Sequence, residues 1–182
     1  MFVLKPYQRE RVDTFLSQLT GEGMSGSVGD AYQIEQAKIA IGSGGWTGKG
    51  YGEGIQSRLD YIPEQHTDFI YTVTAEEFGF FGAAGVLLAW GVLLGWGLAI
   101  AMRCESRFGR FAAAGAVATI AFYVAFNIGM VTGLLPVVGV PLPLISYGGT
   151  AMFTTMACFG LILSAHNYKT EKLHNTRLFS LG

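Results

Sequence analysis

The sequence predicts an all-α membrane protein, in which a large polar loop with short amphipathic helices is followed by three transmembrane helices. Of the 182 residues, 51% are hydrophobic and only 14% are charged, which is too apolar for an ordinary soluble domain of this size. The charges are also unevenly placed, because residues 78–102 and 111–135 contain no Asp, Glu, Lys or Arg. Each of these stretches exceeds the roughly 20 residues that a spanning helix needs.

A third apolar stretch, residues 144–165, also lacks a formal charge, although Ser146 and two glycines interrupt its start. The alternative is a pair of buried helices in a soluble protein. Helices that are uncharged on every side for about 25 residues leave little polar surface for water, which argues against that alternative. We therefore expect three spans within residues 78–165, an outer loop over 1–77 and a tail over 166–182.

Short loops predict the orientation of the spans. The loop between the first two spans carries three Arg against one Glu, the segment after the third span is also net positive, and residues 136–144 carry no charge. Basic short loops tend to stay in the cytoplasm, so the arginine loop and the tail are expected there. Residues 1–77 are then extracytoplasmic. Their six Lys or Arg and eleven Asp or Glu agree with this location without proving it.

Two short amphipathic helices are expected in the outer loop. The first begins near Pro6 and carries apolar residues at helical spacing, namely Val12, Phe15, Leu16 and Leu19. The second has Asp30 as N-cap and Gly42 as a possible C-cap, with Tyr32, Ile34, Ala37 and Ile41 as its apolar residues. Either apolar face can rest on the membrane surface or on the protein.

A glycine-rich run follows, with seven glycines among residues 42–54. It is not a Walker phosphate loop, since the residue after Lys49 is Gly50 rather than Ser or Thr, and it also fails the dinucleotide fingerprint. Two interpretations stay open: a flexible linker, or a loop whose bare backbone closely approaches a ligand. The second interpretation makes Gly44, Gly45 and Gly48 candidate substrate-binding residues.

The run of residues 61–82 concentrates carboxylates at the expected outer membrane surface. If it is helical from Pro63, four polar residues share one face at intervals of four: Glu64, Asp68, Thr72 and Glu76. Ionisable groups at membrane depth are costly unless they serve a hydrated cavity or a ligand, so Asp68 and Glu76 are the catalytic candidates. The alternative, favoured for Glu64 and Glu77, is a surface carboxylate near a helix N-terminus.

The connection between the second and third spans contains Pro136, Pro141 and Pro143, and proline blocks helix continuation. The connection is either a tight turn or a broken helix that forms a wall of the cavity beside Asp68, with Ser146 as a candidate binding residue. A polar Asn127 inside the second span is expected to bond a neighbouring helix rather than a substrate.

Three strings resemble the SEDS family of polytopic membrane proteins, and its RodA branch rather than its FtsW branch. They are LKPYQRERVDTFL from Leu4, QAKIAIGSGGWTGKGYGEGIQSRLDYIPEQHTDFIYTVTAEEFGFFG from Gln36, and NIGMVTGLLPVVGVPLPLISYGGTA from Asn127. The resemblance implies the C-terminal part of a peptidoglycan glycosyltransferase of the bacterial cytoplasmic membrane. Such an enzyme polymerises lipid II into glycan strands during cell elongation and rod-shape maintenance.

The resemblance also implies a site and partners. The essential aspartate of the family's HTDF string falls on Asp68, the candidate general base. Asp68 can instead hold a divalent cation, Mg or Mn, at the diphosphate. Lys49 and Arg58 are candidate cations for that diphosphate, or else solvated surface charges. The implied partners are lipid II, a class B penicillin-binding protein transpeptidase, the elongation machinery and membrane lipids, and no nucleic acid.

Two alternatives to this function remain. A flippase or transporter of the lipid-linked precursor also has broken membrane segments and polar groups within the membrane. The other alternative is an inactive truncated fragment.

Overall fold

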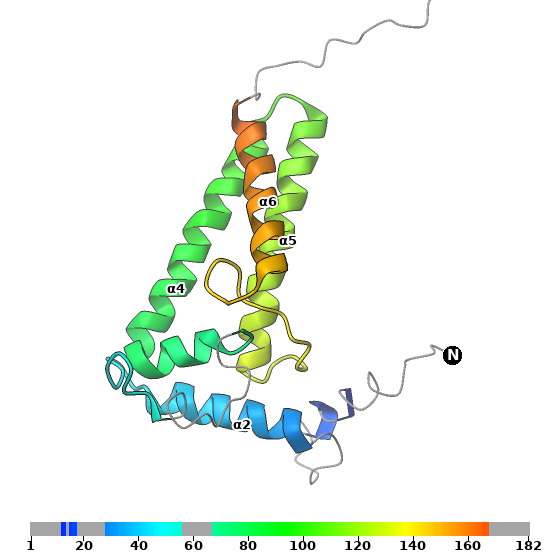
Figure 1. Ribbon diagram of the computed structural model, residues 1–182. Helices are drawn as coiled ribbons and strands as arrows, with labels where there is room; N and C mark the ends of the chain where they lie inside the picture. The colour runs from blue at the N-terminus through cyan, green and yellow to red at the C-terminus, as the bar shows by residue number, and fades with distance from the viewer. Residues whose placement is uncertain (1–11, 14, 18–27, 56–66, 168–182) are drawn as a thin grey trace, which may run out of the picture.

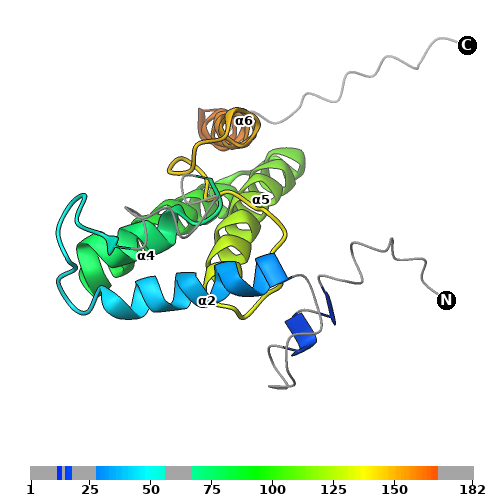
Figure 2. The ribbon, with the colours of Figure 1, turned by 60° about the horizontal axis from the view of Figure 1, so that its bottom comes forward.

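The computed structural model describes residues 12–13, 15–17, 28–55 and 67–167, and within these ranges it contains helices and turns but no strand. The main helices are α2 Val28–Ser43, α4 Ile70–Arg103, α5 Arg107–Val131 and α6 Gly149–Asn167. Helices α4, α5 and α6 form a bundle, and α2 lies across one end of it (Figures 1 and 2). Among the described helices, these three are long and apolar enough to cross a membrane, which confirms the predicted fold class.

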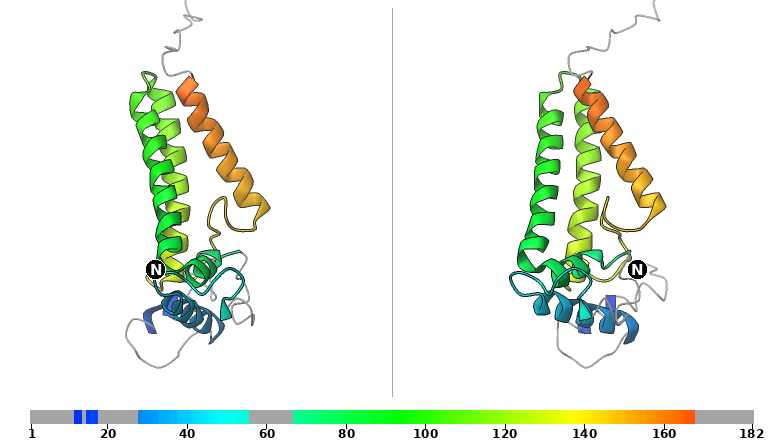
Figure 3. Two further views of the ribbon diagram at one scale, coloured as in Figure 1. Left: turned by 90° about the vertical axis from the view of Figure 1, so that its left-hand side faces the viewer. Right: turned by 60° about the vertical axis from the view of Figure 1, so that its left-hand side comes forward.

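Helix α4 has 34 residues but is broken at Gly79, where φ is 65° and ψ is −160°. This conformation lies outside the helical region and is accessible only to glycine at low cost. The segment before Gly79 lies across the end of the bundle, whereas the rest of α4 runs along α5 (Figures 1 and 3). The part after the break has about 24 residues, enough for one span. It corresponds to the predicted span over residues 78–102.

The other two spans are shifted from their predicted bounds. Helix α5 begins earlier than expected because Ser106 caps it, with its Oγ accepting a hydrogen bond from the Gly109 N–H at 3.4 Å. Helix α6 begins later, at Gly149 rather than 144. The chain instead forms a turn over residues 142–146, in which Leu144 has a φ of 62°, and a β-carbon is unfavourable in that region.

Helix α2 packs on the protein rather than presenting its apolar face to the surroundings. Ile34, Ala37 and Ala40 are buried on one face that contacts α4 and α5. The predicted bounds were wrong: α2 begins at Val28, so Asp30 is not its N-cap, and Gly42 lies inside it. The predicted helix after Pro6 falls mostly outside the described residues, of which 12–13 and 15–17 are helical.

The bundle is tight at one end and open at the other. A β-carbon on Gly97 of α4 would lie 2.7 Å from Val117 of α5 and 3.6 Å from Ile162 of α6, so a small residue lets the helices approach. Beyond it, the Cys104 Sγ donates to the carbonyl of Ala165 at 3.2 Å. Toward the opposite end, α6 diverges from α4 and α5, and the chain between α5 and α6 occupies that end (Figure 3).

Candidate functional site

Asp68 lies in a turn at the open end of the bundle, just before α4. The helix begins at Ile70, with Phe69 at the N-cap position, so Asp68 does not share a helical face with Thr72 and Glu76 as the sequence predicts. Thr72 and Glu76 do share a face, and both are fully buried. The polar face therefore turns into the protein at the bundle end, and Glu64, its first predicted member, lies outside the described residues.

The turn at Asp68 is tied to the connection between α5 and α6. The Asn127 Nδ2 donates to the carbonyl oxygens of Asp68 and Val140, each at 2.7 Å. Asn127 therefore bonds within the protein, as expected, although its partners are two carbonyls outside the helices rather than a neighbouring helix. This amide joins a segment before α4 to a segment after α5.

The Asp68 carboxylate lies beside Gly139, a residue that lines a cavity. Its Oδ2 lies 3.1 Å from the place that a β-carbon on Gly139 would occupy, and Gly139 has a φ of 76°. Gly139 lines an open cavity of about 320 Å³ between α5, α6 and their connection. The other lining residues are Tyr123, Val138, Val140, Pro141, Thr150, Ala151 and Thr154. The connection is thus an irregular cavity wall beside Asp68, which favours the second of its two interpretations.

The glycine-rich run packs its backbone against the break in α4. A helix break at Gly79 leaves carbonyls before it and N–H groups after it without helical partners, and the run supplies partners on both sides. The hydrogen bonds are Lys49 N–H to Glu76 O (3.1 Å), Gly50 N–H to Glu77 O (3.0 Å), Phe80 N–H to Gly45 O (2.8 Å) and Phe81 N–H to Trp46 O (3.3 Å).

Two glycines make this close approach possible. A β-carbon on Gly44 would overlap the carbonyl oxygen of Ala75, and one on Gly48 would overlap that of Glu77. The bare backbone therefore approaches the protein's own helix, which is incompatible with a flexible linker. Gly45 is exposed with a φ of 57°, and a ligand contact for any of these three glycines stays a prediction.

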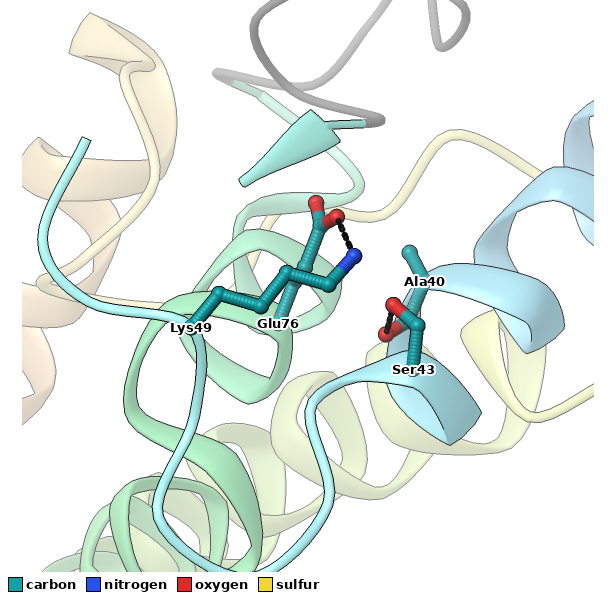
Figure 4. Close-up of polar contacts among 4 residues, drawn as sticks. All are labelled: Ala40, Ser43, Lys49 and Glu76. Carbon is teal, nitrogen blue, oxygen red and sulfur yellow. Dashed lines mark hydrogen bonds and ion pairs between the residues drawn. The ribbon is translucent and has the colours of Figure 1, made fainter. Parts of the chain in front are cut away.

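An ion pair reinforces the contact between the run and α4. The Lys49 Nζ lies 2.8 Å from the Glu76 Oε1, and the two side chains are 24% and 1% exposed. Figure 4 shows Lys49 reaching from the loop toward Glu76, beside the end of α2 where Ser43 bonds Ala40. A buried carboxylate needs such a counter-charge. Lys49 is therefore not a solvated surface charge.

We predict that Lys49→Met lowers the stability of the protein more than Glu76→Gln does. Removing the ammonium group leaves the buried Glu76 charge without this partner, at a cost of about 3 kcal/mol, or a fall of roughly 6 to 12 °C in the unfolding midpoint. Glu76→Gln leaves a lysine that water can still reach. The measurement is thermal unfolding in detergent, followed by circular dichroism. Lys38→Met, at an exposed lysine of α2, is the control, and an equal effect of both lysine variants would contradict the prediction.

The remaining predicted site residues contribute less. Arg58 lies outside the described residues. The Ser146 Oγ accepts a hydrogen bond from the Leu142 N–H at 2.7 Å, so this hydroxyl closes the turn before α6, and a substrate contact stays a prediction. Within the described ranges, no three His, Cys, Asp or Glu side chains gather to hold a metal ion, and a divalent cation at Asp68 stays a prediction.

Comparisons with known proteins agree over almost the whole chain. The cell cycle protein family FTSW_RODA_SPOVE matches residues 1–171. The chain is 48% identical over 168 residues to the peptidoglycan glycosyltransferase MrdB of Escherichia coli K12, covering 92% of this chain and 44% of MrdB. It is 38% identical over 162 residues to the peptidoglycan glycosyltransferase RodA of Treponema pallidum, covering 89% and 36%. The chain thus spans less than half the length of these relatives.

The fold is similar to that of a chain in a solved peptidoglycan synthase complex, described as coordinating polymerization and crosslinking. The TM-score is 0.71 at 32% sequence identity, and the match covers 93% of this chain and 44% of the other.

Proposed function

This chain belongs to the FtsW/RodA/SpoVE family of cell cycle proteins, and from that premise we propose that it carries the catalytic base of a peptidoglycan glycosyltransferase acting on lipid II. The single observation that supports this most is the place of Asp68. Its carboxylate lies beside Gly139, which lines an open cavity at one end of the three apolar helices, and we infer that this end faces outward, where the sugars of a lipid-linked substrate would be presented. The relatives MrdB and RodA are both named peptidoglycan glycosyltransferases, which supports the reaction class.

In the proposed step, a sugar hydroxyl of one glycan attacks the anomeric carbon of the next. A new C–O bond forms while the C–O bond to the diphosphate breaks, and the undecaprenyl diphosphate leaves with the electron pair. The Asp68 carboxylate accepts the hydroxyl proton, since general bases act on the attacking group in the transition state. Lys49 and Arg58 are the candidates that stabilise the diphosphate, although Glu76 already balances the charge of Lys49.

Glu76 is less suited to be the base than Asp68. Its side chain is 1% exposed and its Oε1 is engaged by Lys49, whereas Asp68 is partly exposed beside Gly139, which lines the cavity. A base has to come within hydrogen-bond distance of the acceptor hydroxyl. We therefore assign the proton transfer to Asp68, and to Glu76 the role of holding the glycine-rich run against α4.

The proposal includes a partner and a cellular role. The fold is similar to a chain of a complex that coordinates polymerization and crosslinking, which supports a class B penicillin-binding protein as the transpeptidase partner. The resemblance to the RodA branch supports a role in cell elongation in the bacterial cytoplasmic membrane.

The test is to supply lipid II to the full gene product that carries this sequence, purified in detergent with its transpeptidase partner. Glycan strands that a muramidase digests to disaccharide units are expected. The flippase alternative predicts transfer of labelled lipid II across proteoliposome membranes with no polymer, and that result would overturn the proposal.

The proposed topology places the Asp68 end of the bundle outside the cytoplasm. We predict that cysteines at the exposed positions Tyr51 and Tyr147 react with a membrane-impermeant maleimide on intact spheroplasts. A cysteine at exposed Phe108, in the arginine loop, should react only after permeabilisation, because basic short loops stay in the cytoplasm. The background variant replaces Cys104 and Cys158 with alanine. Labelling at position 108 but not at position 51 in intact spheroplasts would reverse the topology.

A further inference from the structure

Asn127 uses both hydrogens of its amide on two segments that are far apart in the sequence. Its Nδ2 donates to the Asp68 carbonyl and to the Val140 carbonyl, both at 2.7 Å. The orientation of the amide is fixed by this environment, because only the NH₂ group can donate to two carbonyl oxygens. Asn127 lies on a third element, α5, and its side chain thus fixes the distance between the two segments.

The burial of the Asn127 side chain indicates that its two donated bonds are the reason for a polar residue at this position. Asn127 is 0% exposed, and its Oδ1 has no hydrogen-bond partner among the residues that the structure describes. A buried polar atom without a partner is unfavourable, so an apolar side chain would suit the interior of α5 better if packing alone mattered. The favourable contribution of Asn127 to the structure is therefore its two donated hydrogen bonds.

The two acceptors of these bonds lie on the two segments that form the proposed site. One ends on the backbone of Asp68 itself, and the other ends on Val140, the neighbour of Gly139. The Asp68 Oδ2 faces Gly139 so closely that a β-carbon there would lie 3.1 Å away. Both Gly139 and Val140 line the cavity. The position of the carboxylate relative to the cavity wall is therefore set through Asn127.

We propose that Asn127 is the positioning residue of Asp68, and that it holds the carboxylate against the cavity wall at the distance that proton transfer needs. The inference rests on the proposed function. Displacing a catalytic group by about 1 Å can lower a rate on the order of 100-fold. Because Asn127 is buried away from the cavity surface, its loss should lower kcat and leave KM for lipid II nearly unchanged.

The test compares Asn127→Leu, which removes the donors at similar volume, with Asn127→Gln, which keeps an amide on a longer arm. We expect a fall in kcat of about 10- to 100-fold for the leucine variant, partial recovery for the glutamine variant and a KM within about twofold of wild type. Thr119→Val is the control on α5, since the Thr119 hydroxyl is exposed and bonds only its own helix at Gly115.

Hydrogen–deuterium exchange supplies a second readout that a general loss of packing would not reproduce. In the leucine variant, exchange should rise in peptides covering residues 67–72 and 137–142 while α5 and α6 keep their protection. Unchanged kcat, or faster exchange throughout all three long helices, would overturn the positioning role. If the wild-type protein makes no polymer, the glycosyltransferase function fails and the kinetic role falls with it, while the exchange result still judges whether Asn127 holds the two segments.

Discussion

Replacing Asp68 with asparagine should abolish glycan polymerisation and leave the fold intact. The substitution keeps the shape of the side chain and the carbonyl that Asn127 binds, but it removes the proton acceptor. Loss of a general base lowers a rate by about 100- to 10,000-fold. The measurement is the initial rate of polymer formation from lipid II by the full gene product with its transpeptidase partner. The midpoint of thermal unfolding should match that of the wild type.

Two neighbouring carboxylates serve as comparisons for Asp68. Glu76→Gln should lower the unfolding temperature through the lost ion pair with Lys49 but retain polymerisation per folded molecule. Glu77→Gln should change neither quantity greatly, because Glu77 is partly exposed and its Oε1 accepts, within the described part of the chain, one hydrogen bond from the loop N–H of Gly52 at 3.1 Å. Wild-type polymer yield from the Asp68→Asn protein would remove Asp68 from the mechanism and move attention to Glu76.

Replacing Gly48 with alanine should detach the glycine-rich run from the break in α4. Gly48 has a φ of 81°, and its β-carbon would overlap the carbonyl oxygen of Glu77. The left-handed backbone alone costs about 1 to 2 kcal/mol for alanine, and overlap in a packed region adds about 1 to 3 kcal/mol. We expect the unfolding midpoint to fall by roughly 10 °C, together with faster proteolysis of residues 44–52.

Other glycines separate the two causes of this effect. Among the described residues, Gly42 has neither a positive φ nor a close neighbour, and Gly52 has a φ of 74° but no atom within 4 Å of the place of its β-carbon. A β-carbon on Gly44 would overlap the carbonyl oxygen of Ala75, although the φ of Gly44 is not positive. The loss of stability should therefore be smallest for Gly42→Ala, intermediate for Gly52→Ala and Gly44→Ala, and largest for Gly48→Ala. If Gly48→Ala is no worse than Gly52→Ala, the close approach to α4 is not a determinant of stability and the linker interpretation returns.

The sequence by itself determined the helical membrane class and the approximate places of the spans. A long run of residues without charge indicates that the segment lies in a hydrocarbon layer, because each charge placed there is costly whatever its neighbours are. The large apolar residues that remain exposed on the bundle, among them Leu88, Trp96, Phe122 and Phe153, are consistent with that reading. The sequence also indicates Asp68 as the candidate base, by its place before the first span and by the HTDF string.

Only the tertiary structure decided how the site is assembled. A glycine inside an apolar run is a weak signal, so the break at Gly79 was not predicted, and neither was the loop that hydrogen-bonds its two sides. The regular spacing from Asp68 to Glu76 likewise predicts one helical face, although the helix begins at Ile70. Helical periodicity reports contacts between residues three and four apart. The bonds from Asn127 to Asp68 and from Lys49 to Glu76 cross 59 and 27 residues, and such bonds form only where the packing of separate helices brings donor and acceptor together.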